Sequence, residues 1–195
     1  MIYRVFLPDY WAPRVVVAAC LARVRSLSMM RFLLVFLVVA LSIALGLWWA
    51  GSRLPDPRVA TGERALPGDA EAFRALLDAV EDQPRWRRNV TRVERQREIW
   101  IEYDARGQAI RFRWTERGPN RYRLAFEGGF GVSGEWTATW VPVANGLQVR
   151  VEERVSVPHP LRRLMVRVFF DPEAFMNAWF DDVEAELRRK EAAHG

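Results

Sequence analysis

The sequence predicts an α+β domain in which a curved antiparallel sheet wraps around a long C-terminal helix, with a single transmembrane helix in front of it. Three observations lead to this prediction. Residues 32–50 are an uninterrupted apolar stretch. Strand-like segments follow one another between 90 and 157 with short turn signals between them. From 161 to 190, apolar residues recur at helical spacing.

Residues 32–50 read FLLVFLVVALSIALGLWWA, with Ser42 as the only polar residue. A helix of that length spans roughly 28 Å, about the hydrocarbon thickness of a bilayer. The segment is apolar on all sides and ends in Trp48 and Trp49, where an aromatic belt belongs, which a buried core helix does not explain. Small residues at 44–46 leave a cleaved signal peptide as the alternative, but the run is long for one, and we expect an uncleaved anchor.

The flanks of this span suggest its orientation. Residues 1–31 form an N-terminal arm, for which a translation start at Met29 or Met30 is the alternative. Slightly more arginines precede the span than follow it, at positions 14, 23, 25 and 31 against 53, 58 and 64. By the positive-inside rule we expect a single-pass protein with a cytoplasmic N-terminus and its domain outside the cytoplasm.

The distribution of charge argues against a nucleic-acid partner. The chain has a formal net charge of +5, but residues 1–53 hold six arginines and one acid, so the rest is neutral. A nucleic-acid-binding domain is expected to be basic as a domain. Cys20 is the only cysteine, and His159 and His194 are the only histidines, so we expect no metal and no cofactor.

After a linker at 51–58, the first part of the domain is expected to be helical. Asp69 is placed to cap a helix over 70–80, with apolar residues on one stripe, and Pro84 to stop it. The stretch EDQPRWRRNVTRVE at 81–94 then turns the chain into the sheet, with Trp86 plugging its edge. We expect most of its arginines on the solvated side near acidic residues, with binding of an anionic head group as the alternative.

Turn signals divide the centre of the chain into short antiparallel strands. The expected segments are 90–97, 98–104, 109–116, 121–127, 135–143 and 147–157. A last amphipathic helix is expected from about 161 to 190, followed by a tail at 191–195. Because proline removes a helix donor, Asp171 and Pro172 either kink this helix or restart it.

These segments resemble the SRPBCC superfamily, which includes polyketide cyclase/dehydrase-like and START-like domains, over residues 59–190. The motifs that carry the resemblance are Pro-x-Trp-x-x-x-Val after a helix, a Gly-x-Trp strand start and a Pro-x-x-Arg helix start, at Pro84, Trp86, Val90, Gly134, Trp136, Pro160 and Arg163. The resemblance implies the helix-grip fold, a further strand at about 59–65, and a deep apolar cavity between the sheet and the long helix.

The large side chains on one face of the predicted sheet are the candidates for lining that cavity. Strict alternation along a strand places every second residue on the same face. An ordinary packed core is the alternative for this face, but rings of this size can also line a binding site. The predicted ligand-binding residues are Tyr103, Phe112, Trp114, Tyr122, Leu124, Phe126, Trp136, Trp140, Glu153, Phe175 and Trp179.

Glu153 is the exception to the apolar pattern. It occupies the apolar parity of LQVRVEERVSV, so alternation points its carboxylate inward, where an unpaired charge is unfavourable. A structural pair with Arg95 or Arg97, or a bulge that returns Glu153 to water, would remove this conflict. Otherwise Glu153 is a polar anchor for a ligand or a general base.

Together these patterns predict a membrane-anchored domain that binds an apolar molecule such as a lipid, a quinone or a polyketide-like compound. The expected partners are the bilayer and this small molecule. The alternatives are a cyclase or aromatase, and a domain with a filled core that serves protein contacts. Few inward polar groups are available to move protons, so the pattern favours binding over catalysis and assigns no catalytic residue.

Overall fold

The computed structural model describes residues 12–194, which form two units. Residues 1–49 belong to the first and residues 50–195 to the second. The start of the predicted arm, 1–11, and the tail residue Gly195 lie outside the described residues. Helix α1 (Ala12–Arg53) includes the predicted span, and its Met29–Arg53 portion is long and apolar enough to cross a membrane by length and composition.

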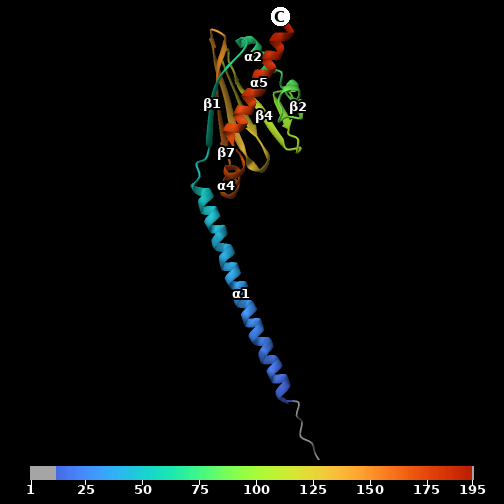
Figure 1. The fold of residues 1–195 in the computed structure, drawn as a ribbon, viewed down its shortest axis with the longest axis vertical. Helices are drawn as coiled ribbons and strands as arrows, with labels where there is room; N and C mark the ends of the chain where they lie inside the picture. Colours follow the sequence, from blue (N-terminus) through green and yellow to red (C-terminus); the bar gives the residue numbers. More distant parts are fainter. Residues whose placement is uncertain (1–11, 195) are drawn as a thin grey trace, which may run out of the picture. The chain divides into compact units, whose positions relative to one another are not determined.

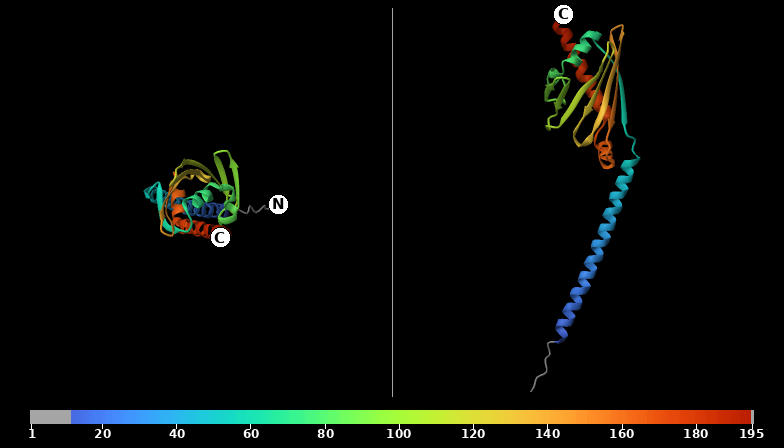
Figure 2. Two further views of the ribbon diagram at one scale, coloured as in Figure 1. Left: turned by 90° about the horizontal axis from the view of Figure 1, so that it is seen from above. Right: turned by 180° about the vertical axis from the view of Figure 1, so that it is seen from behind.

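The second unit has the predicted α+β fold. Its seven strands form one antiparallel sheet in the order β1-β7-β6-β5-β4-β3-β2. They are β1 (Arg58–Leu66), β2 (Arg92–Gln96), β3 (Ile99–Tyr103), β4 (Ala109–Arg117), β5 (Arg121–Glu127), β6 (Ser133–Val143) and β7 (Gly146–Ser156). Strand β1, implied by the resemblance alone, pairs with β7 along its whole length. Viewed from above, the sheet curves around the C-terminal helix (Figure 2).

The helices start near the predicted residues but end differently. Asp69 accepts hydrogen bonds from the backbone of Glu71 and Ala72 and so caps α2 (Ala70–Asp78) as predicted. The prediction that Pro84 stops this helix was wrong. The chain passes through a 3₁₀ turn at Val80–Asp82, and Pro84 lies in the first turn of a new short helix, α3 (Gln83–Trp86), where its missing N–H costs nothing.

The predicted last helix is two helices, α4 (Pro160–Phe169) and α5 (Pro172–His194), so the chain restarts at Pro172 rather than kinking. The carboxylate of Asp171 accepts hydrogen bonds from the backbone of Glu173 and Ala174, as an N-cap does. Helix α5 crosses the concave face of the sheet, and α4 lies at the end of the sheet where β1 begins (Figure 1).

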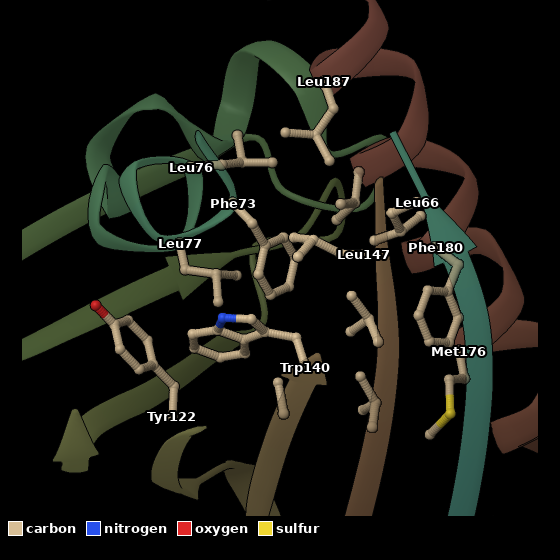
Figure 3. Packing of buried hydrophobic residues seen from close by; sticks show 14 residues of the cluster. Leu66, Phe73, Leu76, Leu77, Tyr122, Trp140, Leu147, Met176, Phe180 and Leu187 are labelled. Atoms are coloured by element: carbon tan, nitrogen blue, oxygen red, sulfur yellow. The ribbon is translucent and has the colours of Figure 1, made fainter. Parts of the chain in front are cut away.

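The hydrophobic core fills the opposite end of this face, beneath α2. Figure 3 shows Phe73 from α2 and Phe180 from α5 converging on Trp140 and Leu147 of the sheet. The rings of Phe73 and Trp140 meet edge to face with their centroids 5.2 Å apart. Because α2 covers only this end, the remaining part of the concave face is left for a cavity.

Candidate ligand-binding cavity

A cavity of about 460 Å³ lies between the concave face of the sheet, α3 and α5. Nine of the predicted site residues line it, namely Tyr103, Phe112, Trp114, Leu124, Phe126, Trp136, Glu153, Phe175 and Trp179. The exposed residues Ala105, Arg106 and Gln108 also line it and mark an open side at the β3–β4 turn. Its volume falls within the range of small-molecule sites.

Tyr122 and Trp140 point to the same face but do not line the cavity. Both are buried in the core beneath α2, with ring centroids 5.3 Å apart, and Tyr122 donates a hydrogen bond to Asp78 of α2 at 3.1 Å. Alternation fixes the face of a residue, whereas its position along the strand decides whether it meets α2 or the cavity. These two residues are therefore placed in the core.

The aromatic wall of the cavity is held by ring-to-ring contacts. Trp100 stacks on Phe112 with centroids 5.4 Å apart and contacts Trp114 at 5.1 Å. Trp136 meets Trp179 of α5 edge to face at 5.4 Å. Such pairs hold large side chains in place, so the wall is largely preformed. Trp100 was missed, although its alternation with Glu102 in IWIEY marks both residues as sharing a face.

A buried polar network forms one side of the cavity. The Arg87 guanidinium donates to Glu102 at 2.8 Å and to Gln83 at 2.5 Å, and the Trp100 indole donates to the second oxygen of Glu102 at 2.9 Å. Most of the arginines of 81–94 lie on the solvated side as expected, and Arg87 is the exception, since its side chain is only 14% exposed. Arg87 lies in the interior because it forms an ion pair with Glu102, which points inward from β3.

Glu153 points inward and borders the cavity, as its parity predicts. It lies opposite Ala60 on β1 and Trp136 on β6, and the pairing of β7 passes through it without a bulge. The predicted structural pairs do not form: Arg95 pairs with Glu81, and Arg97 lies in the β2–β3 turn. Among the residues whose side chains the structure describes, none forms a hydrogen bond or an ion pair with Glu153.

Glu153 is partly exposed rather than fully enclosed, because its carboxyl faces the cavity. Burial raises the pKa of its carboxyl from 4.5 to about 7, and the positive charge of Arg87 offsets part of that rise. Near neutral pH the group is therefore divided between its acid and carboxylate forms, so it can donate or accept a hydrogen bond or a proton. Among the described residues no group of three or more His, Cys, Asp or Glu side chains could hold a metal ion.

Comparison with known proteins places the fold. A START superfamily protein from Mycobacterium smegmatis superposes with a TM-score of 0.54 and 12% identity, over 67% of this chain and 97% of that one. Norcoclaurine synthase from Thalictrum flavum, in complex with a transition-state analogue, gives 0.56 and 12%, over 71% and 99%. The chain has the helix-grip fold of these START-like proteins.

The di-domain aromatase/cyclase StfQ of steffimycin biosynthesis is a further structural neighbour. It has a TM-score of 0.52 and 11% identity, over 69% of this chain and 51% of that one. At such identities the likeness extends to the helix-grip fold and not to the residues of the site. No protein-family model matches the sequence, and no curated protein matches it.

Proposed function

We propose that this protein is a membrane-anchored helix-grip domain that binds an apolar molecule carrying one polar group. The observation that supports this most is the cavity of about 460 Å³, with its large apolar and aromatic lining and a single inward carboxyl that has no protein partner among the described residues. Apolar burial would supply the binding free energy, at about 25 cal/mol per Å² of apolar surface removed from water.

Glu153 would orient this ligand. In its acid form the carboxyl donates to a carbonyl or ether oxygen, and in its carboxylate form it accepts from a hydroxyl. A lipid, a quinone or a polyketide-like compound offers such groups on an apolar frame. Arg87 and Glu102 already satisfy one another, so the polar side of the cavity supports its shape rather than competing for the ligand.

The anchor rests on the Met29–Arg53 portion of α1, whose residues from Met29 to Trp49 are exposed although the portion is strongly apolar. In this proposal the portion is uncleaved and crosses the bilayer, with the domain outside the cytoplasm. The protein should stay in the membrane pellet after a carbonate wash. A soluble chain that begins near Leu47 would instead identify a cleaved signal peptide.

The binding proposal is tested by extracting the purified protein with organic solvent and identifying co-purified molecules by mass spectrometry. An apolar compound should be recovered at near-stoichiometric yield, and Glu153→Gln should reduce that yield while the fold is retained. Glu152→Gln is the matched control, since Glu152 directly precedes Glu153 on β7 and pairs with Arg154 on the other face of the sheet. Natural protein that contains no such compound would refute ligand binding. Equal yields from the two variants would refute the role of Glu153.

A proton-transfer enzyme is the second candidate, and one observation favours it. A pKa of about 7 is near the value expected of a general acid or base at neutral pH. Two structural neighbours are named as an aromatase/cyclase and a synthase. Conversion of the extracted compound by the natural protein but not by Glu153→Gln would favour this candidate. A domain with a filled core does not fit the cavity volume.

A further inference from the structure

Helix α4 has an apolar face that no part of the described chain covers. Met165, Val168 and Phe169 share one side of the helix, at the i, i+3, i+4 spacing, and are 59%, 66% and 79% exposed. Arg163, Val166 and Arg167 lie on the other side and, with Phe170 just after the helix, line a small pocket of about 50 Å³ against β1 and β7. The more apolar side of α4 is therefore turned away from the domain, which is the opposite of what is usual for an amphipathic helix on a protein surface.

The charges of α4 are all positive. At 100° per residue, Arg162 falls beside one edge of the apolar stripe, next to Phe169, whereas Arg167 lies near the opposite side and lines the small pocket. Both are exposed, and the helix contains no acidic residue. An exposed apolar stripe on a helix whose only charged residues are arginines is typical of helices that lie in the interface of a bilayer with anionic lipids.

The beginning of the domain unit is tied directly to α4. The backbone of Gly51 approaches Pro160 so closely that an added Cβ would lie 2.1 Å from the Pro160 carbonyl oxygen. Arg163 donates to the backbone oxygen of Leu54 at 3.0 Å and to the Asp56 carboxylate at 2.9 Å. The apolar portion of α1 ends at Arg53, so α4 is bonded to the residues that directly follow the proposed span.

The open side of the cavity lies at the same end of the sheet. Strand pairing links Arg58, the first residue of β1, to Val155, Val155 to Gly134, and Gly134 to Phe126. It continues through β4 to the β3–β4 turn, where Arg106 lines the cavity. The first residue of β1, α4 and the cavity opening are therefore at one end of the domain.

We propose that α4 docks this end of the domain on the surface of the bilayer, which holds the cavity opening toward the lipid. The inference rests on the proposed membrane anchor. An apolar ligand could then pass between the bilayer and the cavity without crossing bulk water. Glu153 borders both the cavity and the small pocket under α4, so the two spaces share this residue as part of their lining.

The test places a fluorophore at single cysteines in the full chain. In a Cys20→Ser background, Val168→Cys on α4 is compared with Val141→Cys, an exposed valine near the β6–β7 hairpin at the other end of the sheet. Leu41→Cys, inside the span, reports on the anchor. Each protein is reconstituted into vesicles of phosphatidylcholine and phosphatidylglycerol that carry lipids brominated either near the head group, which report on α4, or deep in the acyl chains, which report on Leu41.

Bromolipid should quench the label at Val168, as it quenches the label at Leu41, and leave the label at Val141 bright. Quenching at Leu41 without quenching at Val168 would refute the docking of α4 and leave the anchor standing. A label at Val168 that is shielded from aqueous iodide but not quenched by bromolipid would identify a protein partner on this face and would also overturn the proposal. No quenching at Leu41 would refute the anchor and the docking together.

Discussion

Replacing Glu153 with glutamine should make the domain more stable at alkaline pH, which tests the isolation of this carboxyl directly. The folded-state pKa is about 7, above the ordinary value of 4.5, because burial disfavours the charged form. Below pH 4.5 the carboxyl is neutral in both states and contributes no penalty. As the pH rises, the unfolded chain ionises first, so stability falls until the pH passes the folded pKa and is level above it.

The size of the effect follows from the two pKa values. A displacement from 4.5 to about 7 corresponds to a loss of about 3 kcal/mol between acid and mildly alkaline pH. Glutamine has nearly the same shape and does not titrate, so the variant should lack this part of the decline. At about pH 8 we expect Glu153→Gln to exceed the natural protein by on the order of 2–3 kcal/mol, with the two nearly equal at about pH 4.5.

The assay is urea unfolding of residues 50–195, followed by tryptophan fluorescence from about pH 4.5 to about pH 8. The difference between variant and natural protein isolates Glu153 from the other groups that titrate in this range. Glu152→Gln, with its exposed pair to Arg154, should show no such pH-dependent difference. Parallel stability curves for Glu153→Gln and the natural protein would show that Glu153 is solvated in the folded state.

Two further predictions concern the wall of the cavity. Trp86 packs against the core but is only partly buried, and its buried indole N–H has no hydrogen-bond partner among the described residues. Trp86→Ala should therefore lower the free energy of unfolding by about 2–3 kcal/mol, which is below the range for a fully buried tryptophan. Trp86→Phe should lower it by less than ~1 kcal/mol. Equal losses for the two variants in thermal unfolding would contradict this prediction. Arg87→Met strands the Glu102 carboxylate in the interior and should cost about 3–5 kcal/mol, while Arg85→Met, at an exposed pair, should change the free energy of unfolding by less than ~1 kcal/mol.

The sequence was sufficient to predict which side chains face the interior, because the strands are regular and their period is two. Phe112 and Trp114 on β4, Leu124 and Phe126 on β5, and Glu153 on β7 all lie where alternation puts them. Pairing through Glu153 continues without a bulge, so nothing along β7 upsets this count. The fold class followed from the same alternation together with the helical spacing near the C-terminus.

The division of this interior face into core and cavity could not be predicted in the same way. Trp140 and Trp136 have the same parity on one strand, yet α2 covers the first and leaves the second on the cavity. The place where α2 crosses the sheet is set by tertiary packing and has no local signal in the sequence. Arg87 could not be singled out among the arginines of 81–94 for a related reason, since its partner Glu102 is distant in sequence and only the packing of α3 on β3 joins them.

The two inward carboxyls of the cavity show why Glu153 is a better candidate than Glu102 for contact with a ligand. Both lie on the concave face of the sheet, and both border the same space. Glu102 receives an arginine and an indole N–H, one on each oxygen, which is how a buried carboxylate is satisfied by the protein. Glu153 has no such partner among the described residues. The positive charge of Arg87 offsets only part of the effect of burial, so the pKa of Glu153 stays at about 7. A carboxyl serving the fold alone would be expected to resemble Glu102. The missing partner of Glu153 is thus best supplied by the polar group of whatever molecule occupies the cavity.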